Sequence, residues 1–136
     1  MKRKHITVAV GPVLVVRQSK DRPTDAEWTD SMKQFRTLLN VHGMNTRVLI
    51  HTDGGGLNAG QRDDLKQHIE KMPIRCAVLS DSVFARVLAS TFALFNRNLR
   101  SFAASGLADA LAFLEVSGNE KTWVQEALER MTTQLE

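Results

Sequence analysis

Short apolar runs alternate along the chain with longer amphipathic segments, and this alternation constrains the fold more than any other feature. Residues 47–51, 74–79 and 99–103 are predicted to be buried strands, because they are too short for helices. The segments between them carry apolar residues at helical spacing. Strands alternating with helices predict crossover connections and a mainly parallel sheet covered by helices. The sequence therefore predicts an α/β fold.

Two strands and a helix precede this region. Residues 6–10 and 13–17 are β-branched runs separated by Gly11-Pro12, a pattern typical of a hairpin. Thr24-Asp25-Ala26-Glu27 has the form of a capping box, and apolar residues follow at helical spacing until Gly43. Two helices are predicted after the last strand. The expected order is therefore ββαβαβαβαα, around a mixed, mainly parallel sheet of about five strands.

The chain of 136 residues fits a single domain, 1–136, with an additional C-terminal helix expected over residues 119–136. No apolar run approaches the roughly 18 residues needed to cross a bilayer, so no integral membrane segment is expected. Gly11-Pro12 interrupts the apolar start, which disfavours a cleaved signal peptide. The single cysteine, Cys76, allows no internal disulfide and fits a cytoplasmic location.

Charge is unevenly distributed along the chain. Residues 1–104 hold 16 Lys/Arg against 9 Asp/Glu, a balance of +7, whereas residues 105–136 hold 2 against 6, a balance of −4. The positive charges are spread thinly and no aromatic–basic motif accompanies them, so no nucleic-acid partner is expected. No spacing typical of a metal site occurs, and no cofactor is expected.

The glycine-rich loop between the strand at 47–51 and the next helix is the first candidate site. It comprises Asp53, Gly54, Gly55, Gly56, Leu57 and Asn58, and Asn58 is placed to cap the helix. A nucleotide-binding loop would need Lys and Ser/Thr directly after the glycines, and these are missing. Two interpretations stay open: a tight turn that needs glycine, or exposed N–H groups that contact an anion or a partner.

The carboxyl ends of the strands offer a second candidate site. His51 and Asp53 follow one buried strand, and Ser80, Asp81 and Ser82 follow the next. Ligands commonly bind at such strand ends in open α/β sheets, so a hydrolase using His51 with Ser80 or Ser82 is one hypothesis. No nucleophile elbow is present, however, and each Ser and Asp is also explained as a helix cap.

The helix that starts at Asp81 or Ser82 supplies a third candidate. Its inward face is expected to hold Val83, Val87, Leu88, Thr91, Phe92 and Phe95. Core packing explains its aromatic residues, and a pocket for an apolar ligand is the alternative. The residues of that pocket would be Phe84, Leu88, Phe92 and Phe95. In the polar loop that follows, Arg97 and Arg100 are candidate contacts for an acidic ligand or a lipid headgroup.

The element order and the stretch RVLIHTDGGGL resemble STAS domains, the fold of anti-sigma-factor antagonists. In that family a buried strand ends in Asp-Ser/Thr-Ser-Gly-Leu, whose second hydroxyl residue is phosphorylated. Asp53, Gly56 and Leu57 match the pattern, but Gly55 stands at the phosphorylated position. The family's switch therefore cannot operate at this position, because glycine has no hydroxyl.

The second half is similar to STAS-like proteins related to the lipid-binding CRAL-TRIO domains. The similarity lies in the AVLSD strand at 77–81, the apolar helix at 83–95, the strand ending in Phe102, and the ALAFL helix at 110–114. The resemblance covers about residues 6–116 and implies a small bacterial STAS-like domain with its core there and without enzymatic activity. It would bind a protein partner through the glycine-rich loop and the following helix, or alternatively carry or sense a lipid or small apolar ligand.

Two further expectations follow from this interpretation. A Gly55→Arg substitution should leave folding intact yet abolish partner binding. The last helix has an apolar stripe that must pack either on its own sheet or on a second subunit, so a homo-oligomer is also expected as an alternative.

Overall fold

Five strands form one mixed sheet in the structure, a computed structural model that describes residues 3–70, 73–94 and 96–135. The strands are β1 (His5–Val10), β2 (Val13–Gln18), β3 (Arg47–Thr52), β4 (Arg75–Leu79) and β5 (Leu99–Phe102). They lie side by side in the order β1-β2-β3-β4-β5. Only β1 and β2 are antiparallel, and every other pair is parallel. The α/β class and the five-stranded mixed sheet are confirmed.

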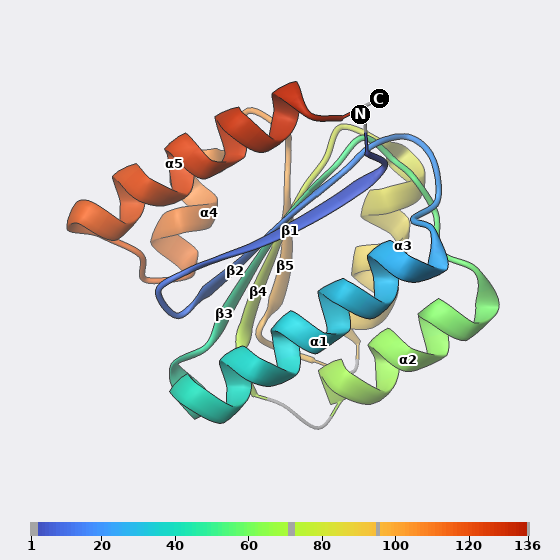
Figure 1. The fold of residues 1–136 in the computed structure, drawn as a ribbon, viewed down its shortest axis with the longest axis horizontal. Helices are drawn as coiled ribbons and strands as arrows, with labels where there is room; N and C mark the ends of the chain where they lie inside the picture. The colour runs from blue at the N-terminus through green and yellow to red at the C-terminus, as the bar shows by residue number, and fades with distance from the viewer. Residues whose placement is uncertain (1–2, 71–72, 95, 136) are drawn as a thin grey trace.

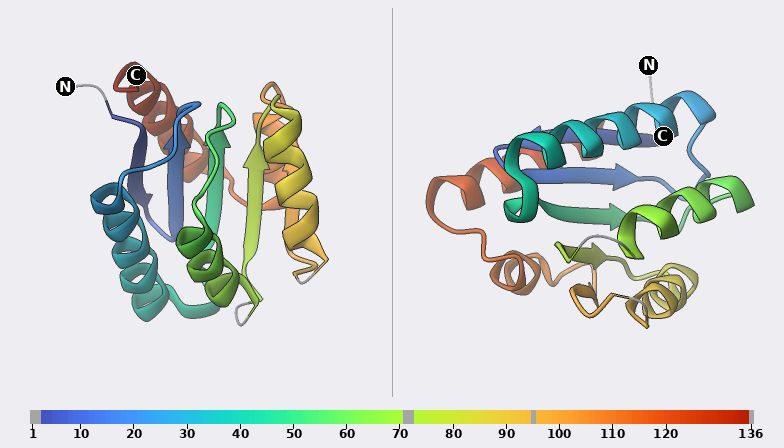
Figure 2. Two further views of the ribbon diagram at one scale, coloured as in Figure 1. Left: turned by 90° about the vertical axis from the view of Figure 1, so that its right-hand side faces the viewer. Right: turned by 90° about the horizontal axis from the view of Figure 1, so that it is seen from below.

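The helices cover both faces of the sheet. They are α1 (Asp25–His42), α2 (Ala59–Glu70), α3 (Val83–Ala93), α4 (Leu107–Phe113) and α5 (Gly118–Thr133), with a short 3-10 turn at Gly43–Asn45. Because each parallel strand is added on the same side of the one before, right-handed crossovers place α1, α2 and α3 on one face. Helices α4 and α5 cover the other face (Figure 1 and Figure 2). The structure thus has three layers.

Local signals explain where the first helix begins and ends. Thr24 and Glu27 form the expected capping box: Thr24 Oγ1 accepts from the Glu27 amide at 3.1 Å, and Glu27 Oε1 accepts from the Thr24 amide at 2.9 Å. Gly43 ends the helix with φ at +55°. The sequence predicted both ends because capping involves only neighbouring residues.

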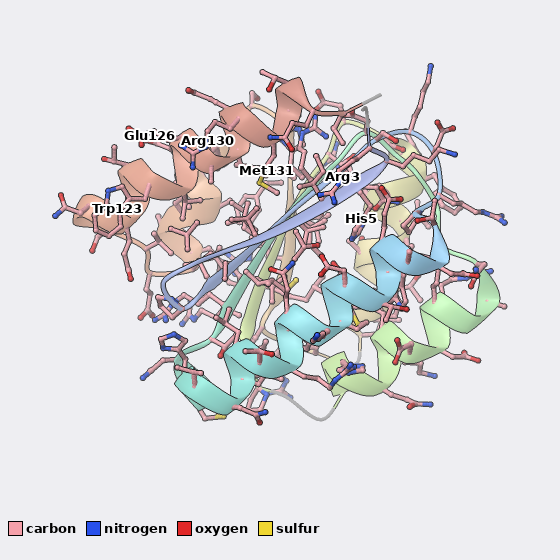
Figure 3. All side chains as sticks on the ribbon, in the orientation of Figure 1. Arg3, His5, Trp123, Glu126, Arg130 and Met131 are labelled. Atoms are coloured by element: carbon pink, nitrogen blue, oxygen red, sulfur yellow. The ribbon has the colours of Figure 1, made fainter. Side chains whose placement is uncertain are left out.

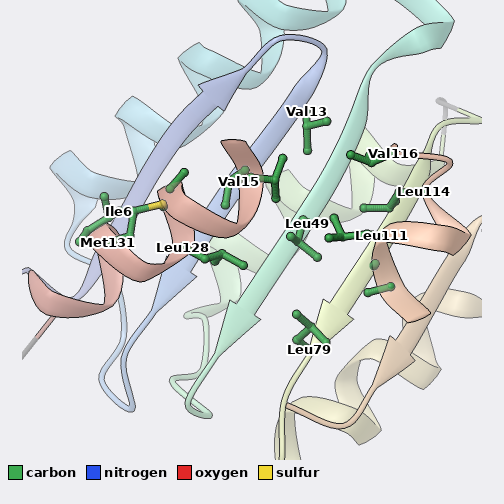
Figure 4. Close-up of a cluster of buried hydrophobic side chains, with 14 of the residues drawn as sticks. Ile6, Val13, Val15, Leu49, Leu79, Leu111, Leu114, Val116, Leu128 and Met131 are labelled. Carbon is green, nitrogen blue, oxygen red and sulfur yellow. The ribbon is translucent and has the colours of Figure 1, made fainter. Parts of the chain in front are cut away.

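Residues along the strands alternate between two apolar cores. The first lies between the sheet and α4 and α5, and includes Val13, Val15 and Leu49 (Figure 4). The second lies between the sheet and α1 to α3, and includes Leu14 and Val48. The strands read as continuous apolar runs because both of their faces are covered.

Helix α5 packs on the chain's own sheet. Its apolar stripe is buried, with Met131 at 2% exposure, whereas Trp123 on its outer side is 52% exposed (Figure 3). The stripe contacts Ile6 and Val15 within the first core. The structure therefore decides where this helix packs, and the stripe needs no second subunit.

The predicted inward face of α3 is right only in part: Leu88 and Phe92 pack against the second core as predicted. Val83, Val87 and Thr91 were expected to face the sheet, but all three are exposed. The small residues Ala85 and Ala89 are buried instead, together with Phe92 as predicted. Alanines let the helix approach the sheet closely, which rotates the larger aliphatic residues outward. Phe95 lies outside the described residues.

Within the described residues, no helix is both long and apolar enough to cross a membrane.

Candidate functional site

A cavity of about 120 Å³ lies between the sheet and helices α1, α2 and α3. Its floor is made mainly by alternate residues of β2, β3 and β4, together with His5 of β1 and Leu99 of β5, and its roof by the three helices and the glycine-rich loop. The side chains that line it include Leu14, Val16, Val48, Val78, Trp28, Met32, Phe35, Leu65, Phe84, Leu88 and Phe92. The predicted pocket residues Phe84, Leu88 and Phe92 are therefore brought together at one site.

The cavity wall is almost entirely apolar. Its described residues include no Asp, Glu, Lys or Arg. Gln18 and Asn96 are turned to backbone partners: Gln18 Nε2 donates to the Gly55 carbonyl at 2.8 Å, and Asn96 Oδ1 accepts from the Asn98 amide at 2.9 Å. A space with such walls excludes charged molecules, because a charge there would lose its hydration without compensation.

His5 belongs to the same wall, at the start of β1 above the first turns of α1 (Figure 3). Its Nε2 lies 2.9 Å from Ser31 Oγ, while Nδ1 is buried and has no hydrogen-bond partner among the described residues. Burial lowers the His5 pKa to about 4, against the opposing effect of Glu27 and Asp30. The imidazole is therefore neutral at pH 7 and adds no charge to the cavity.

The glycine-rich loop is a tight turn that packs against the segment after β2. The Gly55 amide donates to the Ser19 carbonyl at 3.0 Å. A Cβ at Gly55 would lie 2.1 Å from the Asp21 carbonyl oxygen and 2.6 Å from that of Ser19. Gly54 has φ at +108°, and its Cβ would lie 2.7 Å from Ser82 Oγ. The expectation that Gly55→Arg leaves folding intact is therefore wrong, since no side chain fits there.

Most amides of this loop are already paired within the chain. The Asp53 amide donates to the Gln18 carbonyl at 2.9 Å, and the Gly54 amide donates to Thr52 Oγ1 at 3.1 Å. Asn58 caps α2 as predicted, and its own amide donates to Gln61 Oε1 at 3.1 Å. Of the two interpretations of the loop, the geometry favours the tight turn over an open cradle of N–H groups.

The loop nevertheless belongs to the candidate site, because it forms part of the cavity wall. Gly55 and Leu57 line the cavity. Gly56 lies against Phe84, whose Cε1 would be 3.4 Å from a Cβ at that position. Phe84 both lines the cavity and is 56% exposed, so it lies at the boundary between the cavity and solvent. Gly56 and Phe84 therefore mark the opening.

The strand-end residues do not assemble as a hydrolase would require. Ser80 Oγ accepts from the Ser82 amide at 3.0 Å, and Ser82 Oγ caps α3 by accepting from the Ala85 amide at 3.3 Å. His51 pairs with Leu79 in the sheet, so Ser80, the next residue, is directed to the opposite face. Among the described residues, neither of these two serine hydroxyls forms a hydrogen bond with the His51 imidazole.

His51 lies instead beside an ion pair on the face covered by α4 and α5. Arg17 Nη2 lies 3.1 Å from Asp53 Oδ1, and its Nε donates to Thr132 Oγ1 at 3.1 Å. Burial and the Arg17 charge lower the His51 pKa. This cluster anchors α5 to the end of the sheet.

Arg97 and Arg100 lie away from the cavity. Both are exposed, and the Arg100 guanidinium lies 4.7 Å from the centre of the Phe113 ring, on the face covered by α4. The two arginines therefore do not join the apolar site.

Sequence reasoning did not assign the α1 side of the cavity. Trp28, Met32 and Phe35 are among the apolar residues at helical spacing between the capping box and Gly43, and they are buried, as that spacing predicts. Their helical spacing is the same whether a helix packs on other side chains or on an empty space. No local signal could have distinguished the two.

In the described part of the chain, no three His, Cys, Asp or Glu side chains are grouped so that they could hold a metal ion. Comparisons with protein-family models, curated proteins and solved structures find no match for this chain. The STAS-like resemblance and the partner contact at the glycine-rich loop stay predictions.

Proposed function

We propose that this protein binds a small, uncharged, apolar molecule in the cavity between the sheet and helices α1 to α3. The observation that carries the proposal is the cavity itself, about 120 Å³ in volume and walled by apolar side chains from three helices and four strands. Well-packed domains keep few voids larger than a water molecule. A space of this size and composition is therefore a candidate binding site rather than ordinary packing.

The size of the cavity indicates the size of the ligand. An engineered apolar cavity of about 150 Å³ in another protein stays dry and binds benzene or xenon. The cavity here is slightly smaller and similarly lined, so it suits a single aromatic ring or a short hydrocarbon chain. Each CH₂ group moved from water into such a site contributes about 0.8 kcal/mol, which gives useful affinity without any polar contact.

The ligand's route follows from the boundary residues. Phe84 is half-exposed and lies against Gly56, so a change of its side-chain rotamer would widen the opening without moving the sheet. Besides forming a tight turn, the glycine-rich loop leaves room for the ligand in this proposal, because its glycines place no side chain in the opening beside Phe84.

The proposal is tested with benzene as the probe. Benzene at tenfold excess over its dissociation constant should raise the melting temperature by about 3–6 °C. It should also shift amide resonances of α3 and the facing strands in ¹H–¹⁵N spectra. An Ala89→Leu variant should lose both effects, because Ala89 lines the cavity and the larger side chain fills it.

Ala112→Leu is the matched control, since Ala112 is exposed on α4 on the opposite face of the sheet. It should bind benzene as the wild type does. Equal responses of the two variants, or no response of the wild type to benzene, would contradict the proposal.

A further inference from the structure

Helix α3 exposes a second apolar face, directed away from the sheet. Val83 is 77% exposed, Val87 60% and Leu94 82%, and the half-exposed Phe84 lies beside them. The other side of the helix packs on the sheet. A helix that is apolar on both sides is normally covered on both sides. The outer face of α3 is therefore a candidate contact surface.

The exposed large apolar side chains are concentrated on this helix and are not spread evenly over the protein. Four of the eight large apolar side chains that are exposed in the described chain lie on or directly after α3. From residue 83 to residue 94 the helix advances about 16 Å, at about 1.5 Å per residue. Ser90 and Thr91 lie between Val87 and Leu94 on this face. Exposed large apolar side chains gathered on one helix face mark an interaction site more often than chance exposure does.

The charged residues within and directly after α3 are all positive. Between residues 82 and 108 the only charged side chains are Arg86, Arg97 and Arg100. Arg86 lies with Val83, Val87 and Leu94 along a shallow depression beside β5, and Arg97 is exposed just after the helix. The Arg100 guanidinium lies over the Phe113 ring on the other side of β5. It therefore adds to the positive electrostatic potential of this region but does not belong to the outer face of α3.

The acidic residue nearest to the helix along the chain is already engaged. Asp81 precedes the helix, and its Oδ1 accepts from the Ala104 amide at 3.0 Å. The face therefore combines exposed apolar side chains with Arg86 and Arg97, which form no ion pair among the described residues. This combination is typical of helices that lie in the interface of an anionic membrane.

The two other kinds of occupant fit less well. In a dimer related by a two-fold axis, this face would pack against the same face of the second copy. The two Arg86 side chains would then approach each other, and the repulsion between like charges would disfavour the contact. A protein partner usually anchors large side chains in deep pockets, and the depression along α3 is shallow. A fluid lipid surface needs no pocket and accepts exposed apolar side chains directly.

We propose that the outer face of α3 docks on an anionic lipid surface, with Val83, Val87 and Leu94 entering the interface and Arg86 and Arg97 meeting lipid phosphates. The proposal does not depend on the ligand in the cavity. If both hold, Phe84 at the cavity opening would face the membrane when the protein is docked.

The test is co-sedimentation of the full chain with large vesicles, either of phosphatidylcholine alone or with about one third phosphatidylglycerol. We expect binding to the vesicles that contain phosphatidylglycerol, weakened at high salt. Leu94→Glu should reduce binding by more than tenfold, because it removes an inserted side chain and adds a repelled charge. Arg86→Ala should reduce it by about fivefold.

Val41→Glu is the matched control: Val41 is 71% exposed at the end of α1, and the substitution makes the same change in charge. It should bind as the wild type does. Failure of the wild type to bind either vesicle, or equal losses for Leu94→Glu and Val41→Glu, would overturn the proposal. A wild-type dimer that Leu94→Glu converts to a monomer would also overturn it, in favour of a second copy.

Discussion

Replacing Gly55 by alanine tests whether the glycine-rich loop is required for packing. The new Cβ would lie 2.1 Å from the Asp21 carbonyl oxygen and 2.6 Å from the Ser19 carbonyl oxygen. Both are backbone atoms, so neither can rotate away. The loop would have to move as a whole, which would break the Gly55 amide bond to Ser19 and the Gln18 side-chain bond to the Gly55 carbonyl.

The steric clash and the two lost hydrogen bonds determine how far the free energy of unfolding should fall. Forcing extra atoms into a packed site costs about 1–3 kcal/mol, and each lost hydrogen bond costs about 1 kcal/mol. The free energy of unfolding should therefore fall by about 3–5 kcal/mol. For a domain whose total stability is about 5–15 kcal/mol, such a loss is severe.

Urea denaturation followed by tryptophan fluorescence measures the effect, with Gly60→Ala as the matched control. Gly60 lies in the first turn of α2, where the nearest atom to a new Cβ is Asn58 Oδ1 at 3.5 Å, an ordinary contact. That variant should gain about 0.5–1 kcal/mol, because alanine favours a helix. If Gly55→Ala were as stable as the wild type, the loop could not be packed as described, and the reasoning would be refuted.

Three further predictions follow from buried or capping groups. The pKa of His5 is about 4 in the folded protein against 6.5 for the free side chain, so the unfolded chain takes up its proton first as the pH falls. The free energy of unfolding should be independent of His5 titration above pH 6.5 and should fall by about 3 kcal/mol towards pH 4. Urea denaturation across this range should show this fall for the wild type but not for His5→Gln. Burial raises the pKa of the Cys76 thiol to about 12, so it should resist Ellman's reagent at pH 8 until the protein is unfolded. Rapid labelling of the native protein would contradict the burial of this thiol in the cavity wall. Thr24→Ala should lower the free energy of unfolding by about 1 kcal/mol through loss of the α1 cap, whereas an unchanged urea midpoint would show that the capping box contributes little.

The two proposals concern opposite sides of one helix. The inner side of α3, with Ala85 and Ala89, covers the cavity, and its outer side carries the exposed stripe. Each can fail without the other, because benzene binding needs no membrane and vesicle binding needs no ligand. If both succeed, Phe84 is the residue at which they meet.

The sequence by itself determined the elements and the class of the fold. Apolar runs at 47–51 and 74–79 predicted buried strands, and the caps at Thr24 and Asn58 predicted where helices begin. These predictions succeeded because capping and short-range periodicity depend on neighbouring residues and are written in consecutive positions.

The tertiary structure alone decided how those elements face one another. The apolar residues of α3 surround the helix, so their spacing could not select the side with Ala85 and Ala89 as the one that approaches the sheet. The three glycines likewise look the same in a phosphate cradle and in a tight turn. Contact of Gly55 with residues 19–21, more than thirty positions earlier in the chain, decides between them. The cavity exists only because walls from three helices fail to meet over the sheet, and packing between distant segments is not encoded in any local pattern.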